Sequence, residues 1–378
     1  MNTRQHLVVI DPIAFPGGSK VATENILALL PLQGTRVTIL SADRKAWQHP
    51  GWRHVRLFEL PWLARREQGL GYFARHLWIG MQLLLLRLRH GRIDTALGAS
   101  GPGVDLALYL ARGLLRYRVV QLVHGPVARS RTIARCLLRA DQVHYLPSTR
   151  DTLVDALASI RHDPQLDPSR FQVMLNGLPE RAWPSPCQYR RPAIFWAASL
   201  LKWKGLDTLL AAIEQTPQQA RALTTICYIR PRDTALPTSK APVDLARVRW
   251  YQAPPELDAL RADANIFVST SEHEPFGLSI LEAMAAGHCV LIPSDGAYWD
   301  RELHDGIDCI KYRPGDSSDL AVRLAELCVS MDRVRQIGLR AAEHALAYRA
   351  EACYADIVRS LQASRVKPGN AQTRTKAR

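Results

Sequence analysis

Residues 265–287 read NIFVSTSEHEPFGLSILEAMAAG, and this stretch predicts a strand, a turn and a helix in direct succession. NIFVSTS has the β-branched, apolar composition of a buried strand, whereas LSILEAMAAG has the pattern of a helix. Glu274 lies in the turn and Glu282 about two helical turns further on. Because the N-terminus of a helix at the carboxyl edge of a sheet favours anions, we expect a phosphate at this turn.

Apolar runs typical of strands alternate with helical patterns along the rest of the chain. In the first half these runs are 7–10, 36–40, 94–98, 119–125 and 143–148. After the Pro-rich stretch 177–192 the alternation starts again, at 193–199, 223–229, 248–252, 265–271 and 289–294. Two such series predict an α/β protein with two doubly wound parallel-sheet domains that face each other. A ligand is expected in the cleft, at the carboxyl ends of the strands.

The domain boundaries follow from this alternation. We expect an acceptor-binding domain at residues 1–180 and a nucleotide-sugar-binding domain at 181–347. A helix at 348–363 is expected to return towards the first domain, and the basic residues 364–378 are expected to form a disordered tail.

Composition and charge limit the classes of function. The seven cysteines form no C-x-x-C pair, and the first apolar run is too short for a signal peptide, so we expect a cytoplasmic, reduced protein. Residues 1–190 carry 25 Lys and Arg against 13 Asp and Glu, whereas the remainder carries 24 against 22. The basic first half suggests an anionic partner, with a solvated basic surface as the alternative.

The stretch 62–92, WLARREQGLGYFARHLWIGMQLLLLRLRHGR, mixes Trp, Phe and Leu with Arg. Such a helix suits the surface of an anionic membrane. A core helix with arginines on its solvated side remains the alternative. Its apolar run is too short to span a bilayer.

The two carboxylates around the predicted phosphate site suggest the class of ligand. Glu274 at the lip and Glu282 inside the helix can both accept hydrogen bonds from hydroxyl groups. A diphosphate with hydroxyls at both ends describes a nucleotide sugar, with ribose on one side and a hexose on the other.

The segment resembles the donor site of retaining glycosyltransferases with the two-Rossmann-domain (GT-B) architecture, above all glycosyltransferase family four (glycosyl transferases group 1). Four further motifs resemble the same family, and together they cover nearly the whole chain. They are the first loop with Gly17 and Gly18, His124 in LVHGP, Asn176-Gly177 in LNGLPE, and Lys204-Gly205 in AIFWAASLLKWKGLDTLLAAI.

The chain departs from the family at two places. Ser199 stands where the family usually has an arginine for the diphosphate, and Lys202 is a candidate to supply that charge. The next predicted strand ends in YIRPRD rather than in a Gly-rich turn, so the identity of the base stays open.

The resemblance implies a role for each residue. Glu274 would hold hexose hydroxyls, Glu282 the ribose, and His124 the sugar from the opposite domain. Lys204, with Lys202 as a candidate second cation, and the backbone at Phe276, Gly277 and Leu278 would stabilise the leaving diphosphate. Configuration at the anomeric carbon would be retained without a protein nucleophile.

The resemblance also implies the partners. No D-x-D run marks a metal site, so we expect no cofactor and no metal, with the nucleotide sugar as substrate. We expect a glycan or lipid-linked acceptor, in bacterial surface polysaccharide or lipopolysaccharide assembly, with the protein peripheral on the inner face of the cytoplasmic membrane. No nucleic-acid partner is expected.

Other readings of the same residues are open or excluded. A catalytically silent protein that only binds sugar nucleotide or membrane, and a nucleotide-sugar epimerase, remain open. Gly17-Gly18-Ser19-Lys20 lacks the G-x-x-x-x-G-K spacing of a P-loop, so ATP hydrolysis is rejected.

Overall fold

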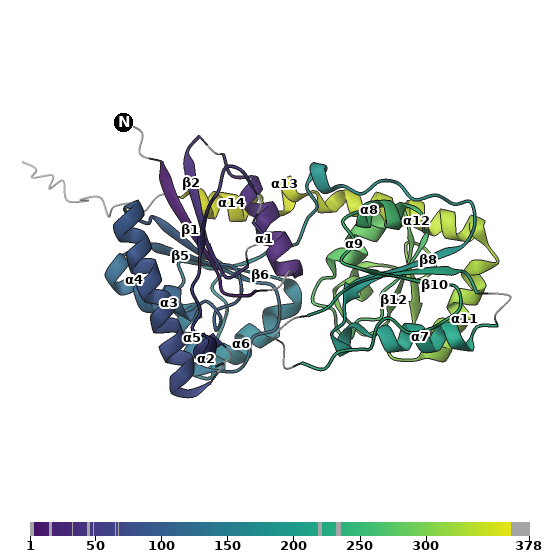
Figure 1. Ribbon diagram of the computed structural model, residues 1–378, viewed down its shortest axis with the longest axis horizontal. Coiled ribbons are helices and arrows are strands. Elements are labelled where there is room, and N and C mark those ends of the chain that lie inside the picture. Colours follow the sequence, from purple (N-terminus) through teal and green to yellow (C-terminus); the bar gives the residue numbers. More distant parts are fainter. Residues whose placement is uncertain are drawn as a thin grey trace, which may run out of the picture.

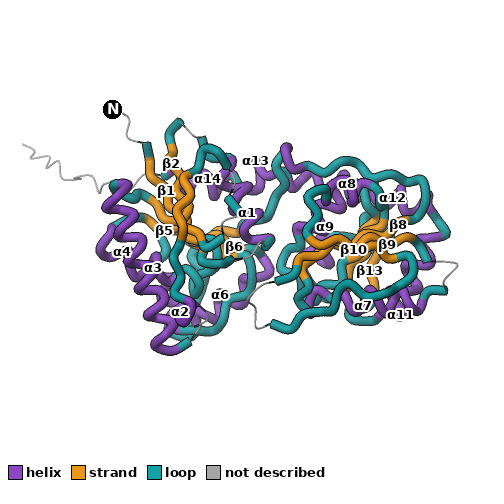
Figure 2. The backbone as a smooth tube through the Cα atoms, viewed as in Figure 1, coloured by secondary structure: helices purple, strands orange, loops and turns teal. Residues whose placement is uncertain are grey.

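The computed structural model describes residues 4–14, 17–31, 33–43, 46–47, 49–64, 66, 68–217, 221–231 and 236–363. The tail predicted at 364–378 lies outside the described residues. Two α/β bodies lie side by side along the long axis of the molecule, each with a central sheet (Figures 1 and 2). The predicted pair of parallel sheets is confirmed.

The first domain is built on a parallel sheet with the strand order β3-β2-β1-β4-β5-β6-β7 among the described residues. Its strands are β1 Gln5–Asp11, β2 Thr35–Ser41, β3 Arg53–Arg56, β4 Thr95–Gly98, β5 Arg118–Val123, β6 Gln142–Tyr145 and β7 Phe171–Val173. Its helices are α1 Gly18–Ala28, α2 Pro61–Ala64, α3 Gly69–His90, α4 Leu106–Leu115, α5 Arg131–Arg139 and α6 Arg150–Ala158. The central strands β1, β4, β5 and β6 are almost entirely buried, because helices cover both faces of the sheet.

The second domain repeats this plan with the order β10-β9-β8-β11-β12-β13, again all parallel. Its strands are β8 Ala193–Ser199, β9 Leu223–Ile229, β10 Val248–Gln252, β11 Ile266–Val268, β12 Cys289–Pro293 and β13 Ile310–Tyr312. Its helices are α7 Leu206–Gln215, α8 Leu257–Ala262, α9 Leu278–Ala285, α10 Tyr298–Glu302, α11 Ser317–Cys328 and α12 Met331–Ala345. In both sheets the strand order reverses at the first strand, which creates the crevice where ligands of such folds bind.

The sequence patterns missed three strands, β3, β7 and β13. Each lies at the edge of its sheet and has only three or four residues. A short edge strand pairs on one side only, so its sequence need not show a continuous buried run. Arg53–Arg56, for example, is mostly exposed.

The chain crosses between the domains twice, at the same place. Leu178 donates its N–H to the Tyr348 carbonyl at 2.9 Å and accepts from the Ala350 N–H at 3.0 Å. A Cβ on Gly177 would lie 2.8 Å from the Ala350 Cα, so only glycine fits this crossing. The helices α13 Ala350–Cys353 and α14 Ala355–Gln362 then lie against the first domain, where the Gln5 amide donates to the Leu361 carbonyl at 2.7 Å. This double crossing fixes the junction of the two domains.

Among the described residues, the helices are all too short or too polar to cross a bilayer.

Candidate active site

The loop after β8 and the loop after β11 are joined through backbone contacts. Gly205 has a φ of 70°, and a Cβ there would lie 2.0 Å from the Thr270 carbonyl oxygen, so the sequence needs glycine at this position. The Thr270 hydroxyl donates to the Lys204 carbonyl at 2.9 Å. The Glu272 N–H donates to the Trp203 carbonyl at the same distance. The two loops therefore position each other's side chains.

The main result of this junction is an ion pair between Lys204 and Glu274. The Lys204 and Glu274 side chains are 17% and 15% exposed, so the pair is mostly shielded but keeps some contact with solvent. The Lys204 ammonium also lies over the Trp203 ring, 4.0 Å from its centroid. The structure thus brings together two residues that the sequence predicted for the site from segments about seventy residues apart.

Aromatic packing fixes the position of the Pro-Phe-Gly turn that follows Glu274. Phe276 is buried and packs on Tyr298 and Trp299, with ring centroids 4.9 and 5.2 Å away. Gly277, with a φ of 79°, is the N-cap of α9, and its carbonyl accepts from the Trp299 indole N–H at 3.3 Å. Phe276 is therefore an anchor for the turn, and the N–H groups at the start of α9 begin with that of Leu278.

The first domain meets this turn directly. A Cβ on Gly18 would lie 3.7 Å from the Leu278 side chain, so the Gly17-Gly18 loop faces the start of α9. The Ser148 hydroxyl donates to the Pro275 carbonyl at 2.6 Å. Ser148 is a contact that sequence reasoning missed, because no local pattern links it to a turn more than a hundred residues away.

His124 follows β5, at the carboxyl edge of the first sheet. Both of its ring nitrogens are buried, and among the described residues neither has a hydrogen-bond partner. Burial lowers the pKa of His124 to about 4, so the ring is neutral at physiological pH. A neutral imidazole with unused nitrogens can donate one hydrogen bond and accept another from a ligand.

A family model described as Glycosyl transferases group 1 matches residues 191–329. These residues are a glycosyltransferase group 1 domain. The resemblance drawn from the sequence is confirmed, and the matched range contains Lys204, Glu274, the Pro-Phe-Gly turn and Glu282.

Two known proteins are similar to part of this chain. Alpha-maltose-1-phosphate synthase of Mycolicibacterium smegmatis is 27% identical over 230 residues, which are 52% of this chain and 58% of that protein. D-inositol 3-phosphate glycosyltransferase of Nocardia farcinica is 28% identical over 168 residues, 42% of this chain and 37% of that protein. The matched segments thus span less than two thirds of either relative.

The solved structure of Anabaena Alr3699/HepE in complex with UDP-glucose superposes with a TM-score of 0.70 at 16% identity, over 95% of this chain and 99% of that one. The predicted GT-B fold is confirmed by this likeness.

In the group 1 domain Glu282 has a partner that the sequence did not reveal. Its carboxylate pairs with the Arg261 guanidinium at 2.6 Å, and Arg261 also pairs with Asp258 at 2.9 Å. Burial raises the pKa of Glu282, and the Arg261 charge opposes this shift. The only sequence signal for Arg261 was its i,i+3 spacing from Asp258 on a helix.

Two further predicted residues of the group 1 domain, Ser199 and Lys202, lie at and just after the end of β8. Ser199 is the last residue of that strand and is partly buried. Lys202 pairs with Asp207 at 2.8 Å, and its side chain is 58% exposed. The two lysines therefore have different partners: Lys204 pairs with Glu274, whereas Lys202 pairs with a carboxylate in the first turn of α7.

Within the described residues there is no group of three or more His, Cys, Asp or Glu side chains suited to a metal ion.

Proposed function

We propose that this protein is a retaining, metal-independent glycosyltransferase that moves a hexose from a nucleotide sugar to a glycan or lipid-linked acceptor. The observation that carries the proposal is the Lys204–Glu274 ion pair beside the N-terminus of α9, facing the Gly17-Gly18 loop. A cation and backbone N–H groups suit a diphosphate, and a carboxylate beside them suits the hydroxyls of a sugar.

In this proposal the donor diphosphate lies against the start of α9. Lys204 exchanges its contact with Glu274 for the diphosphate, and the freed Glu274 carboxylate accepts hydrogen bonds from hexose hydroxyls. Ser271 and Asp295 line the same small pocket as Glu274 and extend its polar surface. Glu282 contributes to the ribose site, with Arg261 holding its carboxylate in place.

The reaction then needs few groups from the protein. The bond between the anomeric carbon and the diphosphate oxygen breaks, and the acceptor oxygen forms its bond to that carbon on the same face. A leaving phosphate oxygen takes the proton of the acceptor hydroxyl. Lys204 and the α9 N–H groups stabilise the charge that develops on the diphosphate. His124 holds the hexose from the first domain through its unused ring nitrogens.

The test is a panel of radiolabelled UDP-, GDP- and ADP-sugars incubated with the protein, with and without bacterial membrane extract. Label transferred to the extract supports a glycosyltransferase. Isomerised sugar without acceptor would indicate an epimerase, and nucleotide binding without any turnover would indicate a silent protein.

Lys204→Ala is expected to weaken binding of the nucleoside diphosphate about tenfold. A hydrogen bond to a charged group contributes about 1.5–3 kcal/mol. We expect the lower value here, because Lys204 must first give up its contact with Glu274. The measurement is calorimetric titration of UDP, GDP and ADP, which also identifies the base.

Lys202→Ala is the matched comparison for this titration. Its exposed ammonium lies with Asp207, so we expect a smaller loss of affinity than for Lys204. A Lys204→Ala protein that binds the preferred nucleotide as tightly as wild type would mean that the phosphate lies on a different loop.

We also propose that the first domain docks on the inner face of the cytoplasmic membrane, as expected for surface polysaccharide or lipopolysaccharide assembly. The solvated side of α3 is apolar: Leu70, Leu77, Leu85 and Leu88 are 89%, 62%, 51% and 73% exposed. The helix contains no acidic residue and has arginines in its last turn. It lies on the outer side of the first domain, away from the second domain (Figure 1). This arrangement favours anionic lipid over water.

Leu77→Asp is therefore expected to weaken binding to phosphatidylglycerol vesicles strongly, whereas Val322→Asp, at a similarly exposed position on α11, is not. Wild-type binding should fall steeply with salt and vanish on phosphatidylcholine vesicles. Sedimentation with vesicles measures both effects. Equal binding to both lipids, or no loss in the Leu77 variant, would contradict membrane docking by α3.

A further inference from the structure

Glu274 follows a residue with an uncommon backbone conformation. His273 has a φ of 46°, in the left-handed region, and its side chain is 81% exposed. A residue with a side chain keeps such a conformation only when surrounding contacts hold it there. On the other side of Glu274, Pro275 restricts Glu274 itself to extended conformations. The direction of the Glu274 side chain therefore depends on the turn at His273.

The contact that holds this turn comes from Asp295, in the loop between β12 and α10. Its carboxylate accepts from the His273 N–H at 2.7 Å through Oδ2 and from the Ala297 N–H at 2.9 Å through Oδ1. The Asp295 side chain is only 4% exposed, so these charge-assisted hydrogen bonds are shielded from water. The His273 imidazole contributes less, because it is exposed and its Nδ1 lies 3.8 Å from the carboxylate. Asp295 thus acts mainly on the backbone of His273.

The loop that carries this carboxylate is itself fixed. The Asp300 carboxylate accepts from the Gly296 N–H at 2.7 Å and pairs with the Lys311 ammonium at 2.8 Å. From the same segment, Trp299 supports the Pro-Phe-Gly turn through its ring packing and its indole N–H. The segment from β12 into α10 therefore supports the chain on both sides of Glu274.

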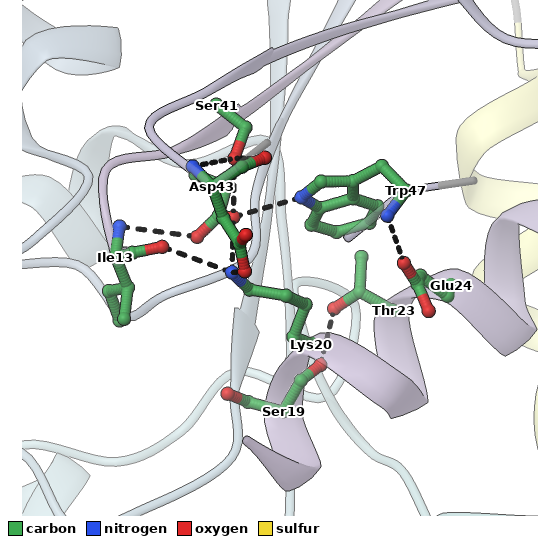
Figure 3. A network of polar contacts seen from close by, with 9 residues as sticks. Ile13, Ser19, Lys20, Thr23, Glu24, Ser41, Asp43 and Trp47 are labelled. Carbon is green, nitrogen blue, oxygen red and sulfur yellow. Dashed lines mark hydrogen bonds and ion pairs between the residues drawn. The ribbon is translucent and has the colours of Figure 1, made fainter. Parts of the chain in front are cut away.

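The N-terminus of α1, which faces the donor turn, is fixed independently by Lys20. The Lys20 ammonium lies 2.9 Å from the carboxylates of both Asp11 and Asp43. It also donates to the Ile13 carbonyl at 3.0 Å (Figure 3). Its three N–H donors thus have three protein partners, which tie α1 to the ends of β1 and β2. A change in the loop after β12 is therefore expected to move the donor turn and not the first domain that faces it.

Building on the proposed function, we infer that Asp295 is a positioning residue for the reaction. Its carboxylate holds His273 in the left-handed conformation and so directs the Glu274 carboxylate towards the hexose of the donor. Asp295 also lines the small pocket around Glu274, so a direct contact with the sugar is the alternative that the test must separate.

Asp295→Ala is expected to lower kcat about tenfold. Without the carboxylate, the turn depends on the intrinsic preference of histidine, which takes a positive φ in on the order of a tenth of cases. The rate should fall with the fraction of molecules that hold Glu274 in place. Asp295→Asn keeps one acceptor oxygen and should lose only about threefold, and it replaces the alanine variant if that protein folds poorly.

Nucleotide affinity distinguishes positioning from a general loss of the site. UDP, GDP and ADP contain no hexose for Glu274 to hold. Calorimetric titration of the nucleotide that the wild type prefers should therefore show a loss of affinity below about threefold in Asp295→Ala.

A second change, at His273, separates the backbone effect from a direct contact with the sugar. His273→Gly in the Asp295→Ala background is expected to recover kcat to about half of the wild-type value, because glycine takes positive φ about as readily as negative φ. His273→Ala in the same background is the matched control. It removes the same imidazole but disfavours a positive φ, so kcat should stay at the level of Asp295→Ala or below it.

Hydrogen–deuterium exchange tests the turn without any substrate. The peptide that covers residues 270–277 should take up about one further deuteron at short times in Asp295→Ala, since the His273 N–H loses its acceptor. A peptide from α11 should not change.

Three results would overturn the inference: unchanged deuterium uptake or kcat in Asp295→Ala, a loss of nucleotide affinity as large as the loss of kcat, or a recovery with glycine no greater than with alanine. The last result would indicate that Asp295 contacts the sugar directly. The exchange experiment separates this inference from the proposed function. If Asp295→Ala loosens the turn but the wild type transfers no sugar from any donor, the glycosyltransferase and the catalytic role of the turn are refuted, whereas the contact that holds the turn stands.

Discussion

Replacing Glu274 by alanine is expected to lower turnover about 100-fold, which corresponds to about 2.7 kcal/mol of lost transition-state stabilisation. The carboxylate has two tasks in the proposed site, to orient the hexose and to hold Lys204 in place before the donor binds. Both tasks help to hold the reacting sugar in one position, and a small displacement of that sugar lowers the rate strongly. The measurement is kcat with the preferred nucleotide sugar.

The effect should be on catalysis rather than on folding. Glu274 lies in a turn whose position is set by the buried Phe276, so the alanine variant should keep the thermal stability of the wild type within a few degrees. Glu272→Ala is the matched control, because Glu272 is an exposed glutamate two residues earlier in the same loop. A folded Glu274→Ala protein with wild-type kcat would falsify the assignment of Glu274 to the donor sugar.

The second large effect concerns stability in acid. Burial lowers the pKa of His6, His76, His124 and His144 to about 4 and that of His288 to about 3. In the unfolded chain each histidine titrates near the ordinary histidine pKa of 6.5. Between pH 6.5 and 4 the unfolded state therefore binds protons that the folded state does not. Stability is expected to fall as pH falls through this window.

The lowered histidine pKa values also indicate how large the loss of stability is. Each histidine with a folded pKa of about 4 contributes about 2 kcal/mol of lost stability between pH 7.5 and 5. Asp105 opposes this trend, because burial raises its pKa to about 7 and the folded state takes up its proton first. Burial also raises the pKa of Glu24 and Glu282, with the same opposing sign. The five histidines outnumber these three carboxyls, so we expect a net loss of stability as the pH falls.

Urea unfolding at pH 7.5, 6 and 5 measures this loss. His76→Phe should reduce the number of protons taken up on unfolding by about one, and the stability should depend less on pH. The variant should fold, because neither ring nitrogen of His76 has a partner among the described residues and a phenyl ring keeps the edge contact with Tyr72. His162→Gln, at an exposed position, is the control. If stability were flat from pH 7.5 to 5, the buried histidines would have to be protonated in the folded protein.

The sequence by itself determined the architecture and the strand, turn and helix within residues 265–287. Alternating strand and helix patterns, repeated after a Pro-rich stretch, were enough for two parallel sheets, because a buried parallel strand must be apolar on both faces. The sequence also predicted the Pro-Phe-Gly turn that precedes α9. Strand, Pro-Phe-Gly turn and helix are local features, and local spacing is visible in a sequence.

The short edge strands and the ionic contacts were decided only by the tertiary structure. The strands β3, β7 and β13 were not predicted from the sequence, because a strand that pairs on one side only shows little apolar pattern. Arg261 against Glu282 and Ser148 against Pro275 join separate elements, so no spacing along the chain could reveal them. Lys20 is the clearest case. In the sequence it is one more lysine after two glycines, and only folding brings Asp11 and Asp43 from two neighbouring strands to surround its ammonium.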